Sequence, residues 1–200
     1  MGSNSPDMVD LAFDLKGSLI PADYAFELWR EVARILPWLD AEELAGILPL
    51  RGSDSEGSLL LANRAKLVLR LPVELAAQAG TLSGQKLNMG SGILEVGTST
   101  KRPLQSYTTL HAHLVEGAEE EEVFLEGVAV QLQAMEVSCN WICGKRNTLT
   151  GIGQSLSGYS LVLHDLKPEA SLLVQRAGLG GSRHFGCGIF IPYKDISGLD

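Results

Sequence analysis

The sequence lacks any apolar run long enough to cross a membrane as a helix. Its longest apolar stretches, such as Leu59–Ala62 and Gly188–Pro192, are the length of a short strand, far below the roughly 18 residues that a membrane span needs. We expect no secretion signal, because no basic segment followed by an apolar one begins the sequence. Three cysteines, an odd number, favour reduced thiols over a disulfide framework. These absences predict a cytoplasmic protein without a membrane partner.

Motifs for a bound metal or nucleotide are also missing. Cys139 and Cys143 form a C-x3-C spacing, but no second pair follows at the spacing of zinc ligands. We therefore expect two small buried side chains there instead of a metal site. No Gly-Lys-Ser/Thr sequence occurs, which excludes a P-loop. The sequence predicts neither a metal nor a cofactor.

The net charge of −8 at first argues against a nucleic-acid partner. The charge is unevenly distributed, however. Residues 116–126 hold six glutamates and no base, whereas residues 64–102 and 140–194 each hold six Lys/Arg and two acids. Local potential steers a polyanion, so basic faces on an acidic chain remain compatible with RNA binding. Scattered solvated charges are an equally good interpretation of this composition alone.

Hydrophobic periodicity predicts the same order of elements twice. Strands alternate with a period of two and helices carry an apolar stripe with a period of 3.6. In the first half Asp23 stands where a helix N-cap or a first-turn acid belongs. The expected elements are strands in 8–17, 45–52, 65–72 (with 58–62 leading into it) and 85–97, helices at 22–36 and 73–80, and then strands in 106–116, 147–152, 157–166 and 188–194 with helices at 119–135 and 167–178.

Each half thus reads as βαββαβ, the split-βαβ or ferredoxin-like pattern. We predict an α+β fold of two tandem ferredoxin-like units, with the N-terminal domain at 8–100. The C-terminal domain is expected at 104–195 and includes a glycine-rich loop before its last strand.

That loop lies in "AGLGGSRHFGCGIFIPYK", residues 177–194. A Rossmann or P-loop glycine motif lies between a strand and a helix, so that the helix N-terminus meets the phosphates. Here the order is helix, glycines, strand, and nucleotide binding of those kinds is excluded. Two interpretations remain: a helix cap and bulged turn, or exposed backbone N–H groups that bind RNA phosphates. In the second, the binding residues are Gly180, Gly181, Gly186 and Arg183, with His184 beside them.

Tandem ferredoxin-like units with such a loop resemble the repeat-associated mysterious proteins of CRISPR systems. The segments "VDLAFDLKGSLIPADYAFELWREVARILPWL", "GILPLRG", "NRAKLVLRLP" and "GLGGSRHFGCGIFIP" look like the sixth CRISPR-associated protein family in its MYXAN-type branch. The resemblance implies a metal-independent endoribonuclease that cuts precursor CRISPR RNA by transesterification and leaves a 2′,3′-cyclic phosphate. It also implies that the protein stays on the 3′ stem-loop of the crRNA as a subunit of a surveillance complex.

The sequence departs from this family at one position. The resemblance implies a histidine after the "PAD" turn as general acid or base, and this chain has Tyr24 there. A tyrosine with a pKa near 10 is a poor base at neutral pH, although it can donate a proton. His184 is the best substitute by its location in the loop, so Tyr24 and His184 are the predicted catalytic residues. His111 and His113 share one face of a strand, either toward the core or toward RNA, and His164 is expected to be an ordinary surface histidine.

Five basic residues are predicted to contact RNA phosphates. Lys145 and Arg146 precede a strand in "GKRNTL", and Arg64, Lys66 and Arg70 cluster in "NRAKLVLR". The alternative for each is a solvated side chain. The alternative function is a catalytically weak crRNA stem-loop-binding subunit of a CRISPR effector or CRISPR-associated transposon complex. Its partners would be other effector subunits and transposition proteins.

Overall fold

The computed structural model describes residues 6–193, and Lys194 and Asp195, where the expected second domain ends, lie outside them. The chain separates into two compact units. Among residues 6–193, the first unit contains those up to Pro103 together with Leu149–Gln154, and the second contains Leu104–Thr148 and those from Ser155 onward. No helix within residues 6–193 is long and apolar enough to cross a membrane.

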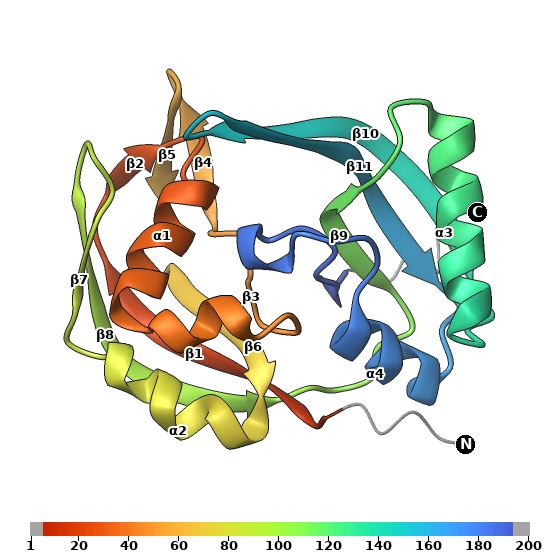
Figure 1. The fold of residues 1–200 in the computed structure, drawn as a ribbon, viewed down its shortest axis with the longest axis horizontal. Helices are drawn as coiled ribbons and strands as arrows, with labels where there is room; N and C mark the ends of the chain where they lie inside the picture. Colours follow the sequence, from red (N-terminus) through yellow and green to blue (C-terminus); the bar gives the residue numbers. More distant parts are fainter. Residues whose placement is uncertain (1–5, 194–200) are drawn as a thin grey trace. The chain divides into compact units, whose positions relative to one another are not determined.

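The first unit has a five-stranded sheet with the order β3-β6-β1-β8-β7 (Figure 1). Central strand β1 is antiparallel to both β6 and β8. When β1, β3, β6 and β8 are numbered 1 to 4 in chain order, their order across the sheet is 2-3-1-4, which is the ferredoxin-like topology. The elements are β1 (Met8–Lys16), α1 (Ala25–Ile35), β3 (Gly46–Ile47), β6 (Lys66–Pro72), α2 (Ala76–Ala79), β7 (Lys86–Asn88) and β8 (Ile93–Pro103).

A separate three-stranded sheet, with the order β2-β5-β4, is inserted into this unit. It consists of β2 (Leu19–Pro21), β4 (Gly52–Ser55) and β5 (Ser58–Leu61). The strand expected across residues 45–52 is therefore wrong, because only Gly46 and Ile47 pair with β6. Pro49 has no N–H to donate to a ladder, so the strand ends before it. The segment 58–62 likewise joins the inserted sheet and does not lead directly into β6.

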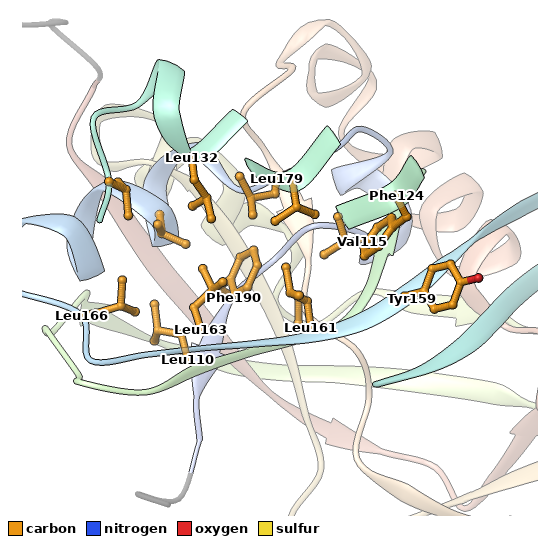
Figure 2. Close-up of a cluster of buried hydrophobic side chains, with 14 residues drawn as sticks. Leu110, Val115, Phe124, Leu132, Tyr159, Leu161, Leu163, Leu166, Leu179 and Phe190 are labelled. Atoms are coloured by element: carbon orange, nitrogen blue, oxygen red, sulfur yellow. The ribbon is translucent and has the colours of Figure 1, made fainter. Parts of the chain in front are cut away.

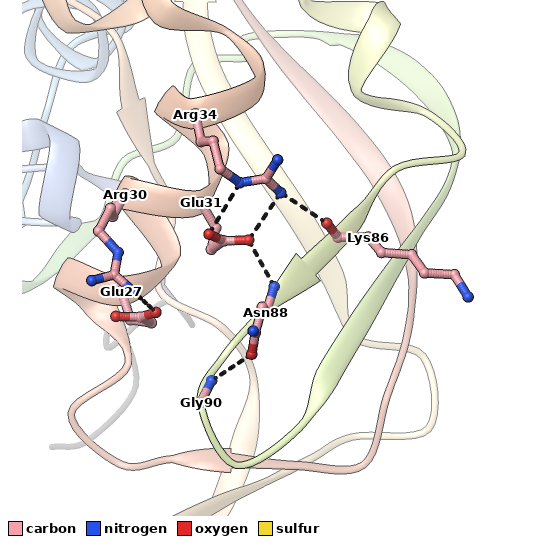
Figure 3. A network of polar contacts seen from close by, with 7 residues as sticks. All are labelled: Glu27, Arg30, Glu31, Arg34, Lys86, Asn88 and Gly90. Atoms are coloured by element: carbon pink, nitrogen blue, oxygen red, sulfur yellow. Dashed lines mark hydrogen bonds and ion pairs between the residues drawn. The ribbon is translucent and has the colours of Figure 1, made fainter.

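Helix α1 is fixed to β7 by a buried carboxylate (Figure 3). Glu31, on α1, accepts two hydrogen bonds from the Arg34 guanidinium, at 3.0 and 3.2 Å, and one from the Asn88 backbone N–H at 2.8 Å. Arg34 also donates to the Lys86 carbonyl at 3.3 Å. The Arg34 guanidinium, together with the Asn88 N–H, lowers the pKa of Glu31. The expected N-cap Asp23 is wrong by one position, because the residue before the helix is Tyr24.

The second unit has a four-stranded sheet with the order β10-β11-β9-β12, again the ferredoxin-like order. Its elements are β9 (Leu110–Glu116), α3 (Glu121–Ala134), β10 (Asn140–Gly151), β11 (Gln154–His164), α4 (Pro168–Ala177) and β12 (Ile191–Pro192). The last strand is shorter than expected, since Gly188, Ile189 and Phe190 precede it. The predicted α+β fold of two ferredoxin-like units is confirmed.

A cluster of buried apolar side chains fills the second unit (Figure 2). The rings of Phe124 on α3 and Tyr159 on β11 lie with centroids 4.8 Å apart. The Tyr159 hydroxyl donates to the Glu119 carbonyl at 2.6 Å, so a polar atom at the edge of the cluster is satisfied. Each fully buried leucine or phenylalanine stabilises the fold by about 1.5–3 kcal/mol. This cluster therefore holds strand β9, which lies between β11 and β12, in a fixed position. The face of β9 that points away from the cluster and the C-terminal end of the strand are available for other contacts.

Candidate functional site

The glycine-rich loop runs from the end of α4 to β12 and folds back on itself. Gly178 ends α4 with φ +70°, and Gly188, near the far end of the loop, has φ +64°. A Cβ on Gly188 would lie 2.0 Å from the Leu179 carbonyl oxygen, and one on Gly178 would lie 2.4 Å from that of Gly188. The two glycines let the backbone pass where no side chain fits. Cap and turn geometry thus explains this pair of glycines without a ligand.

The middle of the loop is anchored to β9 and α3. The Gly180 N–H donates to Gln131 Oε1 at 2.7 Å, and the Ser182 hydroxyl donates to Glu116 Oε2 at 2.6 Å. Gly188 N–H donates to the Leu114 carbonyl at 2.7 Å. Glu116 and Gln131 are contacts that sequence reasoning missed, because neither lies near the loop in sequence. The Gly180 N–H has a protein acceptor, and a carboxylate faces the turn that follows.

Residues 183–185 form a short 3₁₀ turn, η4 (Arg183–Phe185), which Gly186 ends with φ +86°. Arg183 is only 6% exposed, and its guanidinium lies over Gly178, where an added Cβ would be 2.2 Å from Nη1. His184 is partly exposed, with its ring edge-on to Phe185 at a centroid distance of 6.5 Å. The structure thus turns Arg183 inward and presents His184, whereas the sequence alone could not distinguish the two.

Tyr24 directly precedes helix α1 in the first unit, and its side chain is partly buried. The Leu50 backbone N–H donates to the Tyr24 hydroxyl oxygen at 2.8 Å. Burial raises the pKa of Tyr24 above its usual value of 10, and the Leu50 N–H opposes this less strongly. Because its oxygen accepts this bond, the hydroxyl hydrogen can be donated elsewhere. At neutral pH the Tyr24 hydroxyl therefore keeps its proton.

The predicted basic stripe on β6 lies against acidic residues of β1. Arg70 is 1% exposed and holds Asp10 with two hydrogen bonds, Nε to Oδ1 at 2.7 Å and Nη2 to Oδ2 at 2.9 Å. Lys66 forms an ion pair with Asp14, which is directly opposite in the register. Lys66 and the Thr98 hydroxyl lower the pKa of Asp14. The alternation of Asp10 and Asp14 in the first strand was the sequence signal for this neutralisation.

The remaining predicted phosphate contacts are exposed. Arg64 lies in the turn before β6, and Lys145 and Arg146 lie on β10. Arg146 forms an ion pair with Glu119 at 2.9 Å, with both side chains largely in solvent. Such a pair contributes little to stability and can be exchanged for a phosphate. Arg64 and Lys145 are thus the predicted basic residues best presented to a polyanion.

The histidines of β9 face away from the hydrophobic cluster. Leu110 and Ala112 point into it, whereas His111 is half-buried and His113 is exposed. The His111 ring lies 5.1 Å from that of Tyr193, which sequence reasoning did not select. Burial lowers the pKa of His111, so it is neutral at pH 7.

His164 is partly buried, with its Nδ1 2.8 Å from an Asp165 carboxylate oxygen. No group of three or more His, Cys, Asp or Glu that could hold a metal ion occurs among residues 6–193. Cys139 and Cys143 are unbridged and pack against the apolar cluster. Within each unit, the predicted residues that come together are the loop residues 180–186 in the second, and Lys66 and Arg70 with their aspartates in the first.

The fold defines a class, the proteins built from two ferredoxin-like units. A solved structure described as "An RAMP protein binding different RNA substrates" is similar with a TM-score of 0.62 and 11% identity, over 91% of this chain and 98% of that one. Another, described as "Characterization of a Cas6-related gene from Pyrococcus furiosus", has a TM-score of 0.67 and 12% identity, over 94% of this chain and 99% of that one.

Sequence comparison narrows the class to a family. A family model described as "Cas6 Crispr" matches residues 9–195. The "CRISPR-associated endonuclease Cas6" of Myxococcus xanthus (strain DK1622) is 34% identical over 186 residues, which are 92% of this chain and 81% of that protein. The chain belongs to the Cas6 family.

Proposed function

We propose that this chain is an endoribonuclease that cuts CRISPR repeat RNA by metal-independent transesterification. Membership of the Cas6 family supports the substrate class, because the match covers nearly the whole chain. The positioned Tyr24 hydroxyl is the observation that carries the chemistry. It offers a proton at the start of α1, the position where the resemblance implies a catalytic histidine.

The reaction needs one proton removed and one supplied. The RNA 2′-oxygen attacks the adjacent phosphorus and loses its proton, the P–O5′ bond breaks, and a 2′,3′-cyclic phosphate forms while the 5′-oxygen gains a proton. Tyr24 is the proposed donor to that leaving oxygen, and general acid catalysis of this kind contributes about 10²–10⁴-fold. The 2′-hydroxyl proton passes to water.

Phosphate contacts supply most of the affinity for RNA. We assign them to the exposed side chains of Arg64 and Lys145, with Lys66 and Arg146 after exchange of their carboxylate partners. The loop contributes the backbone around Gly181, and Gly180 does so only if Gln131 releases its N–H. Gly186 is left out, because it is buried and its N–H donates to the Arg183 carbonyl at 3.0 Å. We leave Arg70 out because it is buried against Asp10, and Arg183 is assigned to supporting the loop under Gly178. The proposed site of action is the cytoplasm, where repeat RNA is made.

The test is cleavage of repeat RNA by the purified protein in EDTA. Replacing Tyr24→Phe removes the donated proton and keeps the ring, so we expect the single-turnover rate to fall by about 10²-fold or more. Tyr107→Phe is the matched control, since the Tyr107 hydroxyl contacts only the side chain of Gln105 among the described contacts. The cyclic phosphate on the product identifies transesterification.

A catalytically weak crRNA-binding subunit is the second candidate. The observation that favours it is the raised pKa of Tyr24, which denies this position a base. Tight binding of repeat RNA without a cyclic-phosphate product would establish this role and refute the enzyme. Tyr24→His then provides a further test, because an imidazole at this place should restore cleavage if the rest of the site is intact.

A further inference from the structure

We propose that the outward face of helix α3 docks a basic segment of a partner protein. This α3 surface consists of Val123, Gly127, Val130 and Ala134, with Glu122 and Glu126 along its edge. It contains none of the residues proposed for RNA binding or cleavage. The inference goes beyond the proposed function and stands whether or not the chain cuts RNA.

Helix α3 carries apolar side chains on two opposite faces. Phe124, Val128 and Leu132, spaced four apart, are buried in the cluster of the second unit. On the other side Val123 is 48% exposed and Val130 is 65% exposed. Residues seven apart lie on one side of a helix, so the two exposed valines line up two turns apart. Valine also disfavours a helix in water, because its χ1 rotation is restricted. Neither packing nor helix propensity within this chain accounts for these two valines.

Gly127 lies between the two valines, in the middle of the helix. A Cβ at this position would meet no atom within 4 Å, and the φ of Gly127 is not positive. Neither packing nor backbone geometry in this chain therefore requires glycine, although glycine destabilises a helix interior relative to alanine. A glycine allows another backbone to approach the helix closely. Together with the valines it forms a shallow apolar strip that another molecule can cover.

Charge identifies the occupant. Glu122 and Glu126 are exposed, and their spacing of four places them on one side of the strip. Glu120 continues the negative charge before the helix, whereas the Glu119 carboxylate is paired with Arg146 of β10. This surface repels RNA, and a second copy that docked α3 on α3 would bring the same carboxylates together. A protein segment with an apolar ridge flanked by lysines or arginines is complementary on both counts.

The first test is site-specific photo-crosslinking inside an assembled complex. The chain, with a photoreactive phenylalanine at position 130, is co-expressed with guide RNA and the other proteins encoded in the same CRISPR gene cluster. We expect a crosslink to a Lys/Arg-flanked apolar segment of one of those proteins, and none to that segment from the control position Val73, which is 37% exposed in the first unit. Crosslinks only to RNA or to a second copy, or a chain that joins no complex, would overturn the proposal.

The second test separates docking from folding and from RNA binding. Gly127→Ala should raise the melting temperature of the isolated chain by about 2–4 °C and yet weaken retention in the complex. Glu122→Lys/Glu126→Lys should weaken that retention by about tenfold or more. Repeat-RNA affinity and cleavage should stay unchanged in both variants, so a failure of the proposed nuclease function would be seen separately. A Gly127→Ala chain that gains stability and assembles normally would contradict the docking surface.

Discussion

At neutral pH the hydroxyl of Tyr24 can donate a proton but is a poor base, whereas an imidazole can both donate and accept a proton. Its pKa is raised by burial, so deprotonation is rare, while its oxygen is held by the Leu50 N–H. The sequence placed a tyrosine in this position, but only the fold shows that Leu50, 26 residues away, orients it. Both observations support the proposal that Tyr24 donates a proton to the leaving oxygen.

The pH dependence of cleavage follows from this assignment. A tyrosine donor stays protonated up to at least its usual pKa of 10. The cleavage rate should therefore not fall between pH 6 and pH 9 through loss of the general acid's proton. The Tyr24→His variant, in contrast, should lose rate as pH rises through about 6.5, where an imidazolium loses its proton. Single-turnover rates of both proteins across this range are the measurement. A wild-type rate that falls in parallel with that of the histidine variant would contradict Tyr24 as the acid.

At the scale of elements, the glycine loop consists of two parts, a backbone crossing and an accessible side. Gly178 and Gly188 serve the backbone crossing, whereas Gly181 and His184 lie at its accessible side. The sequence identified the loop and excluded nucleotide binding from the order of helix and strand. It could not predict that Arg183 turns inward, because that depends on the αL residue Ser182 and on the space above Gly178.

Replacing Gly188→Ala should disrupt this crossing. The new methyl group would meet the Leu179 carbonyl in a backbone with positive φ, and we expect a loss of about 2 kcal/mol or more in the free energy of unfolding. Gly153→Ala is the matched control, because φ there is +72° but a Cβ would meet no atom within 4 Å. It should cost about 1 kcal/mol. Equal losses in urea unfolding would show that the close contact at Gly188 is unimportant.

The contact between α1 and β7 should make the free energy of unfolding depend on pH in the acidic range. The folded pKa of Glu31 is below its usual value of 4.5, so its contribution is present above that value and lost as pH falls through the folded pKa. Wild-type protein should therefore lose more stability than Glu31→Gln when pH falls from about 5 to 3. Melting temperatures against pH measure this difference. The exposed Glu43→Gln change is the control and should leave the wild-type profile unchanged. Identical profiles for Glu31→Gln and wild type would show that Glu31 does not cause the pH dependence.

At the scale of the whole molecule, net charge is a poor guide to the partner of this protein. The chain carries −8, yet the acids are concentrated around α3 and opposite β6, and basic side chains remain exposed on β10 and before β6. Within the second unit, the exposed carboxylates of α3 suit a basic protein partner, whereas the exposed Lys145 on β10 suits RNA. The inference about α3 depends on the first of these charges and the assignment of Lys145 on the second.

Salt dependence measures how many phosphates the chain contacts. Lys145→Ala should weaken repeat-RNA binding and reduce the slope of log K against log salt by about one. Lys86→Ala is a matched control, because Lys86 is an exposed lysine whose partner at 3.2 Å is Glu95. It should leave the slope unchanged. Binding titrations at several salt concentrations decide the matter, and equal slopes for Lys145→Ala and wild type would withdraw Lys145 from the RNA contacts.

Periodicities of 2 and 3.6 predicted the two ferredoxin-like units, since they are local properties of the sequence that do not require knowledge of contacts. Segments spread along the chain indicated the family. Which charged side chains are exposed followed from the folded chain alone, because their partners are distant in sequence. Asp10 neutralises Arg70 across 60 residues of sequence, and Gln131 and Glu116 hold the glycine loop from 49 and 66 residues away. Such pairings arise from strand register and chain crossing, and the alternating aspartates of the first strand indicated only the first of them.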